Sequence, residues 1–151
     1  MFNNWANDSE VTKTLTWDPH KTIDVTKEIL TSWINRYNDP TFYQFGIELK
    51  DNHQLIGTIT GSDVSNESIE IGYALSKKYW NKGITTEATK AVINYFFKDV
   101  KIPKIIGIHL INNPASGKVM LKCGLKHIYD YDFIDKFNNK TKLCYYEIKN
   151  V

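Results

Sequence analysis

A ten-residue stretch near the middle of the chain has the composition of a phosphate-binding turn. Residues 79–88 read Tyr-Trp-Asn-Lys-Gly-Ile-Thr-Thr-Glu-Ala and lie between an apolar run and a helical pattern that ends near Val100. The first N–H groups of a helix have no intrahelical partner, and together with the helix dipole they bind phosphate-like anions. The stretch therefore predicts a strand-to-helix turn that holds the pyrophosphate of a nucleotide-type cofactor. The alternative is an ordinary turn with a threonine N-cap, because neither the Walker nor the dinucleotide pattern is present.

The overall composition is typical of one globular domain, which we expect to span residues 1–151. The net charge is +2 and the basic residues are dispersed, so there is no electrostatic footprint for nucleic acid. No apolar run approaches the ~20 residues of a membrane span, and the N-terminus lacks the pattern of a signal peptide. Cys123 and Cys144 fit neither a metal site nor a disulfide framework. We therefore expect free thiols, no metal and a cytoplasmic location.

Helical patterns precede a set of strands. The helices are expected over residues 1–6, 9–15 and 22–37, and the strands over 42–50, 55–62 and 68–76. On the third helix one stripe is formed by Ile23, Lys27, Leu30 and Ile34, and it is widened by Val25, Ile29 and Trp33. Short loops join the three strands, which predicts an antiparallel meander.

The second half of the chain predicts a crossover. The turn at residues 79–88 opens a helix with apolar side chains at i, i+3 and i+4 spacing. The near-continuous apolar run at 104–111 is typical of a central strand, and the strand–helix–strand unit implies parallel pairing. A helix from Pro114 to Lys122 and two strands, at 125–135 and 140–149, follow. The prediction is an α/β fold with a mixed sheet and a C-terminal hairpin.

This order of elements, with two motifs, resembles the GNAT N-acetyltransferase superfamily and within it the Rim-type branch that acetylates the N-termini of ribosomal proteins. Residues 70–75, Glu-Ile-Gly-Tyr-Ala-Leu, together with the turn at 79–88, are similar to the acetyl-CoA motif of that branch. The pattern Asn113-x-x-Ser116-x-x-Val119-x-x-Lys122-x-Gly124-Leu125 is similar to its second motif. The resemblance covers nearly the whole chain and implies a GNAT-like fold and acetyl-CoA as co-substrate.

The chain departs from the family pattern in two places. In the superfamily run Gln/Arg-x-x-Gly-x-Gly/Ala, Trp80 takes the first position and Thr85 the last, and only Gly83 is standard. We expect the turn to keep its function, because backbone N–H groups hold the pyrophosphate. Relatives usually begin with a further strand upstream of Phe2, and without it the strand at 42–50 has an exposed edge, which favours association. We expect a monomer or a homodimer.

The resemblance implies which residues bind the cofactor. They are Ile71, Tyr73, Trp80, Asn81, Lys82, Gly83, Ile84, Thr85, Thr86, Asn113 and Ser116. The N–H groups of Lys82 to Thr86 would hold the pyrophosphate, while the Lys82 side chain either adds charge or is solvated. A backbone N–H of the strand at 71–74 would stabilise the oxyanion. Asn113 would hold the pantetheine arm, cap the helix that follows, or do both.

Two side chains are candidates for the base that deprotonates an amine. On the strand at 69–75, alternation places Glu70 on a face kept open by Gly72 and Ala74, which suits a general base acting directly or through water. The alternative is an exposed strand carboxylate. His109 interrupts an apolar strand and is either a rival base or a hydrogen-bonded core histidine.

The leaving thiolate needs a proton donor. Many superfamily members carry a tyrosine four residues after the position of Ser116, where this chain has Met120, and we expect Ser116 to be the substitute. An acyl-enzyme on Cys123 is disfavoured, because no histidine or acidic residue lies near it in sequence. Trp17 is expected to line the acceptor site together with Glu70.

The predicted activity is direct transfer of an acetyl group from acetyl-CoA to a primary amine, in a ternary complex. The acceptor would be a peptide N-terminus or a small molecule. The alternatives are a CoA-binding regulatory or degenerate domain without turnover, and a nucleotide- or phosphosugar-binding module.

Overall fold

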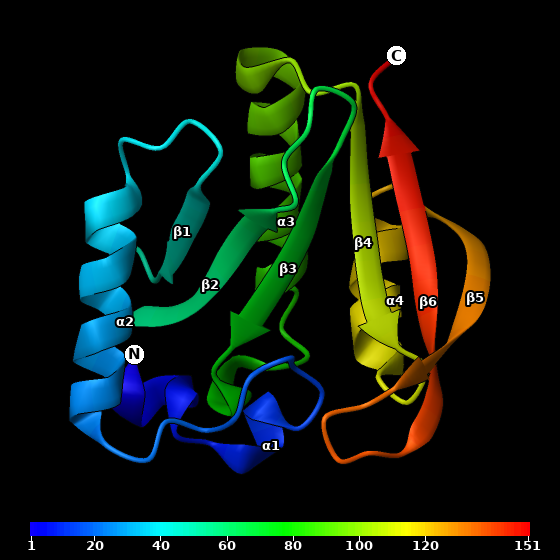
Figure 1. The fold of residues 1–151 in the computed structure, drawn as a ribbon. Helices are drawn as coiled ribbons and strands as arrows, with labels where there is room; N and C mark the ends of the chain where they lie inside the picture. Colours follow the sequence, from blue (N-terminus) through cyan, green and yellow to red (C-terminus); the bar gives the residue numbers. More distant parts are fainter.

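A six-stranded sheet in the order β1-β2-β3-β4-β6-β5 organises the chain. The computed structural model describes residues 1–151 (Figure 1). The strands are β1 (Tyr43–Glu48), β2 (Leu55–Ser62), β3 (Ile69–Leu75), β4 (Lys104–Leu110), β5 (Lys126–Ile134) and β6 (Lys140–Lys149). All neighbouring pairs are antiparallel except β3 and β4, which are parallel. The predicted meander, crossover and C-terminal hairpin are confirmed.

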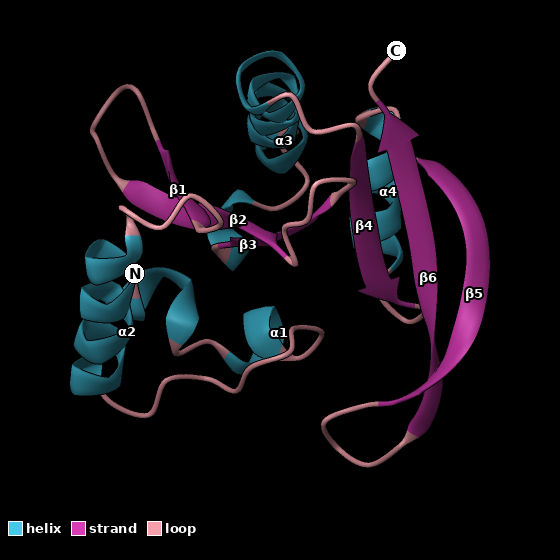
Figure 2. Ribbon diagram, turned by 45° about the horizontal axis from the view of Figure 1, so that its top comes forward, coloured by secondary structure: helices cyan, strands magenta, loops and turns pink.

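The helices cover the two faces of the sheet unequally. The rear face in Figure 1 carries α3 (Ile84–Tyr95), which a π-helical turn at Phe96–Val100 continues, and α4 (Pro114–Lys122). The front face carries a π-helical turn at Phe2–Ala6, α1 (Ser9–Thr12) and α2 (Ile23–Arg36), all on the side of β1 to β3. No helix lies in front of β4, β6 and β5 (Figure 2).

Two hydrophobic cores fill the two faces. The larger lies between the sheet and α3 and α4, where strand alternation turns Ile69 and Ile71 toward Phe96. The smaller lies on the front face and joins Trp5, Ala6 and Val11 to Ala74 of β3. The smaller core holds the N-terminal helices over the lower end of β3.

The structure turns inward only one flank of the stripe predicted on α2. Ile23 is 49% exposed and Ile34 is 66% exposed. The inward line runs instead through Thr26, Leu30 and Trp33, and the Thr26 hydroxyl is hydrogen-bonded to His20 Nδ1 at 2.7 Å. Apolar side chains lie on both flanks of α2. The flank that faces inward is the one where the Thr26 hydroxyl has a hydrogen-bond partner in the preceding loop.

Two further features concern the surface of the molecule. The β1 strand is an edge strand, as expected for a chain without an additional strand beside it. None of the helices combines the length and the apolar character that a membrane span requires.

Candidate active site

The strands β3 and β4 separate partway along their length. They pair only through Ile69–Ile71 and Ile105–Gly107, and below this point their arrows diverge in Figure 1. The Ser76 N–H donates to the Ile56 carbonyl of β2 at 2.8 Å. Since alternate residues of a strand direct their N–H groups to the same side, the backbone groups of Tyr73 and Leu75 face the gap toward β4. The Leu75 carbonyl accepts from Trp80 Nε1 at 2.8 Å, so the gap offers the Leu75 N–H and the backbone groups of Tyr73 to an extended ligand.

The helix α3 begins at this gap without a side-chain cap. Its N-cap residue is Gly83, with φ +77°, and no side chain accepts from the first N–H groups. Asn81 also has a positive φ, of 60°, and these two residues turn the chain sharply into the helix. The threonine N-cap of an ordinary turn is absent, so the first N–H groups of α3 and its dipole remain available to an anion.

A cavity of about 640 Å³ fills the gap. Its walls come from α1, the end of β3, the turn before α3, and the first turns of α3 and α4. It collects ten of the predicted cofactor residues, namely Tyr73, Trp80, Asn81, Lys82, Gly83, Ile84, Thr85, Thr86, Asn113 and Ser116. The remaining one, Ile71, is buried in the larger core, so only its backbone can take part.

Several residues of this cavity were not predicted. Lys118 and Lys122 line it from α4, one helical turn apart, and together with Lys82 they give it a basic rim. The sequence pattern that could have predicted them is their i, i+4 spacing, which places both lysines on one side of the helix that carries Ser116. Thr14 and Leu15 line it from the segment after α1, and no local pattern marks them because only the tertiary fold brings this segment to the gap.

Four polar residues form two hydrogen bonds at the start of α4. Asn113 occupies the N-cap position, but its side chain makes no capping bond and its Nδ2 instead donates to the Thr14 hydroxyl at 3.1 Å. The Tyr73 hydroxyl donates to the Ser116 carbonyl at 2.8 Å. Burial raises the pKa of Tyr73 well above its usual range, so this phenol stays protonated. These contacts fix β3, α1 and α4 around the cavity.

Glu70 and His109 lie on opposite faces of the sheet. Glu70 is half-buried on the front face, where burial, and then the neighbouring Asp63, raise the pKa of its carboxyl. His109 is 7% exposed on the rear face. Its Nδ1 lies 2.7 Å from the Leu110 carbonyl and its Nε2 lies 3.3 Å from the Tyr146 hydroxyl. Both ring nitrogens of His109 thus have partners, which favours the core-histidine interpretation and leaves Glu70 as the better-placed base.

Neither cysteine has the environment of a nucleophile. Cys123 Sγ contacts the Thr86 carbonyl at 3.6 Å, and burial raises the pKa of this thiol. Burial, with Asp130 beside it, raises the pKa of Cys144 to about 11. Both remain thiols at neutral pH, whereas the thiolate is the reactive form. This agrees with transfer that does not pass through an acyl-enzyme.

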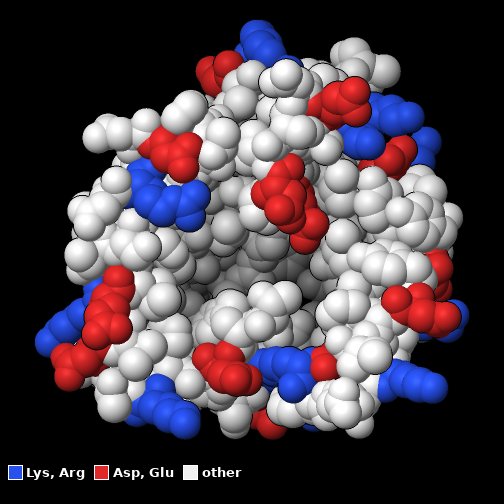
Figure 3. Space-filling model, viewed as in Figure 1, with Lys and Arg blue, Asp and Glu red and all other residues white.

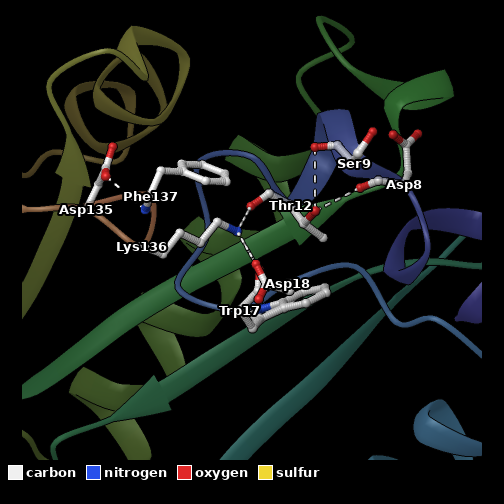
Figure 4. A network of polar contacts seen from close by, with 8 residues as sticks. All are labelled: Asp8, Ser9, Thr12, Trp17, Asp18, Asp135, Lys136 and Phe137. Atoms are coloured by element: carbon white, nitrogen blue, oxygen red, sulfur yellow. Dashed lines mark hydrogen bonds and ion pairs between the residues drawn. The ribbon is translucent and has the colours of Figure 1, made fainter. Parts of the chain in front are cut away.

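The loop that carries Trp17 is tied to the hairpin between β5 and β6 (Figure 4). Lys136 Nζ donates to the carbonyls of Thr12 and Trp17, each at 2.8 Å, and lies 3.5 Å from Asp18 Oδ1. The Trp17 ring packs beside the His20 ring, with centroids 5.3 Å apart, and does not line the 640 Å³ cavity. Its contact with an acceptor stays a prediction.

Comparison with known proteins identifies the class. Residues 1–126 match the family described as the acetyltransferase (GNAT) domain, and the chain belongs to this family. It is 27% identical over 128 residues to the uncharacterized N-acetyltransferase YoaA of Bacillus subtilis, covering 83% of this chain and 72% of that protein. It is 28% identical over 99 residues to the [ribosomal protein uS5]-alanine N-acetyltransferase of Escherichia coli, covering 62% of this chain but only 51% of that one. The resemblance to the GNAT superfamily is thereby confirmed, and a Rim-type enzyme is among the similar proteins.

A solved structure gives the same result for the fold. The GNAT-family acetyltransferase of Bacillus anthracis superposes with a TM-score of 0.85 at 26% identity, over 99% of this chain and 91% of that one. The GNAT-like mixed sheet predicted from the sequence is confirmed.

Proposed function

We propose that the protein is an acetyl-CoA-dependent N-acetyltransferase that moves the acetyl group directly to a primary amine within a ternary complex. The observation that carries this proposal is the cavity between the separating strands β3 and β4, with the uncapped N-terminus of α3 at one end. We also expect a cytoplasmic protein, as a monomer or a homodimer.

The residues around the cavity suit coenzyme A. The free N–H groups of Lys82 to Thr86 would hold the pyrophosphate, with Lys118 and Lys122 supplying positive charge. The pantetheine arm, which carries two amides, would bond to the free backbone groups of β3 and to Asn113. The β3 contacts pair polar atoms of the ligand with backbone groups that lack a partner on that side of the strand, whereas the Asn113 Nδ2 already donates to Thr14 and its Oδ1 is the atom left for the ligand.

The chemistry needs few groups. A water or the Glu70 carboxylate takes the proton from the ammonium, and the neutral amine attacks the thioester carbonyl. A backbone N–H of β3 that faces the gap stabilises the oxyanion. The C–N bond forms and the C–S bond breaks. The attached nitrogen loses a proton, which the Ser116 hydroxyl relays to the leaving thiolate so that the hydroxyl is restored, while Tyr73 holds the Ser116 carbonyl.

Substitution of Thr86 tests the cofactor site. Thr86 lies in the first turn of α3 and lines the cavity. Thr86→Glu places a negative charge where the pyrophosphate would bind, so we expect the Kd for CoA to rise by at least about tenfold, or ~1.4 kcal/mol. A carboxylate in this turn favours the helix by ~0.3–1 kcal/mol, so Tm should not fall. Thr86→Gln is the matched control of equal size, and equal CoA affinity in the two variants would contradict the site.

Turnover separates the proposal from its alternatives. Acetyl-CoA is incubated with a panel of primary amines, and release of CoA is followed with a thiol reagent. Release that depends on the amine supports an acetyltransferase. Calorimetric binding of CoA without release across the panel would indicate a CoA-binding domain without turnover. No binding of CoA would leave the nucleotide- or phosphosugar-binding alternative.

A further inference from the structure

The front face of the sheet is hollowed over Gly72. Gly72 belongs to β3, a central strand, yet it is exposed, and a Cβ added there would meet no atom within 4 Å. Figure 3 shows this face of the molecule, with a hollow at its centre. Gly72 directly follows Ile71, the last residue of β3 that pairs with β4. The hollow therefore adjoins the point at which the cofactor cavity opens between the two strands.

The strands β4, β6 and β5 form one wall of this hollow. Register places Ile108, Tyr145 and Tyr129 in one row across the three strands, and Leu110, Leu143 and Tyr131 in the next. Residues in register share a face, and Ile106 of the same β4 series is in register with Glu70, so these rows face the front. The rings of Tyr129 and Tyr145 stack at 4.8 Å with planes 8° apart. Tyr129 is nevertheless 49% exposed, because no helix covers this wall.

The end of the wall next to β3 is acidic. Glu70 and Asp63 lie close enough for Asp63 to raise the pKa of Glu70, and neither forms an ion pair with a cationic side chain. Burial raises the pKa values of Tyr131 and Tyr145, and the Glu70 charge adds to both. Glu147, the other carboxylate in the row of Glu70 and Ile106, is 3.6 Å from Lys149 Nζ. An unpaired carboxylate thus stands beside two phenols at the edge of an aromatic surface.

We propose that this hollow is the acceptor site and that it takes a small primary amine with an apolar, preferably aromatic, body. The ammonium lies over Gly72 beside the Glu70 carboxylate, and the body packs along Tyr129, Tyr131 and Tyr145. Carboxylates and aromatic faces both attract cations, and the apolar rows remove the body of the amine from water. The inference rests on the proposed function and specifies its acceptor.

The same surface disfavours a peptide as the acceptor. The wall is the face of a sheet whose strands are paired, so it offers no free backbone groups to a peptide chain. Peptide N–H and carbonyl groups laid on tyrosine and leucine side chains would lose hydrogen bonds to water without replacement. Lys136 also ties the β5–β6 hairpin to the loop after α1, so that these two segments meet at the lower side of the molecule (Figure 1).

Equilibrium binding tests the acceptor site without requiring turnover. 2-Phenylethylamine is titrated into the protein with and without CoA, and 2-phenylethanol and an alanyl tetrapeptide with a free N-terminus are titrated in parallel. We expect the amine to bind more tightly than either of the others. Glu70→Gln should weaken amine binding by at least about tenfold and leave alcohol binding unchanged, since only the charge is removed. Glu67→Gln, at an exposed loop carboxylate, is the matched control and should bind the amine as the wild type does.

Gly72→Val tests the position of the site. The valine side chain fills open space, and the backbone there is not in the left-handed region, so the fold should be retained. We expect both phenyl ligands to be lost while the Kd for CoA stays within about twofold, with circular dichroism as the check on folding. Amine binding within twofold of wild type in both Gly72→Val and Glu70→Gln, or tighter binding of the peptide, would overturn the proposal. Amine binding without turnover would contradict the proposed function alone.

Discussion

At Glu70 the role that we propose is opposed to stability. Its carboxyl is half-buried beside Asp63, Tyr131 and Tyr145, and burial, then Asp63, raise its pKa above the ordinary value of 4.5. The folded state therefore holds this proton more tightly than the unfolded state does. The stabilisation that the protonated form provides is complete below pH 4.5 and is lost as pH rises through the folded pKa.

Glu70→Gln should therefore be more stable than the wild type near neutral pH. The amide imitates the protonated carboxyl in size and lacks the charge that burial disfavours. The difference in Tm should shrink toward zero as pH falls to about 4, where the wild-type carboxyl is itself protonated in both states. Thermal melts across this range, with Glu67→Gln as the control, provide the measurement. A Glu70→Gln variant that is less stable than wild type at neutral pH would show that the carboxylate has a partner that stabilises it.

The element that most constrains the site is α4, because it packs on β4 through a glycine. A Cβ at Gly117 would lie 2.7 Å from His109 Nε2 and 3.0 Å from the Tyr146 hydroxyl. This close approach holds the start of α4, with Asn113 and Ser116, against the gap between the strands. His109 thus contributes to the position of α4 from the rear face.

Gly117→Ala should destabilise the protein although alanine is the better helix former. The gain in helix propensity is ~1 kcal/mol, whereas overpacking in a close-packed interior costs ~1–3 kcal/mol, and at 2.7 Å the neighbours must move. We expect a net loss on the order of 1 kcal/mol, measured by urea denaturation. In a His109→Ala background the clash is relieved, and the same substitution should become neutral or stabilising. Stabilisation by Gly117→Ala in the wild-type background would contradict the packing.

At the scale of the whole molecule, the site is closed by contacts between the two ends of the chain. Lys136 joins the hairpin of β5 and β6 to the carbonyls of Thr12 and Trp17, more than a hundred residues away in sequence. Its side chain is only 18% exposed, although its ion pair with Asp18 is at the surface. A single ammonium therefore satisfies two backbone acceptors and connects the segments that carry α1 and the aromatic wall (Figure 4).

Lys136→Met should loosen this closure without unfolding the protein. Methionine keeps the apolar stem and leaves the two carbonyls without their donor, a loss of ~1–3 kcal/mol. Hydrogen exchange in residues 12–18 and 135–139 should become faster. The KM for the amine should rise by a larger factor than the Kd for CoA, because Thr14 and Leu15 form only one wall of the cofactor cavity. Lys140→Met, an exposed strand lysine with no ion pair, is the matched control. Unchanged exchange in residues 12–18 would show that the contact does not restrain the loop.

Local physical chemistry determined much of this protein from sequence. The period-2 and period-3.6 patterns predicted all six strands and the helices α3 and α4, because strand and helix periodicity depend on neighbours within one element. The turn before α3 was predictable for a similar reason, since Gly83 takes a conformation that most other residues avoid. Ten of the predicted cofactor residues line one cavity. They belong to the strand–helix–strand crossover and the helix after it, and the order of these segments along the chain was already predicted.

Only the tertiary structure decided how separate elements face one another. The buried flank of α2 is the one on which Thr26 bonds to His20 of the preceding loop. Thr14 and Leu15 form a wall of the cavity because the segment after α1 packs beside it. The same holds for Glu70, which the register places in one row with Ile106 and Glu147, next to the row that holds Ile108 and Tyr145. A strand's own pattern determines which side chains share a face, but the register between strands distant in sequence is set by the packing of the whole sheet. For this reason the sequence alone could predict a site for the acetyl donor, and the fold was needed to propose a site for the acceptor.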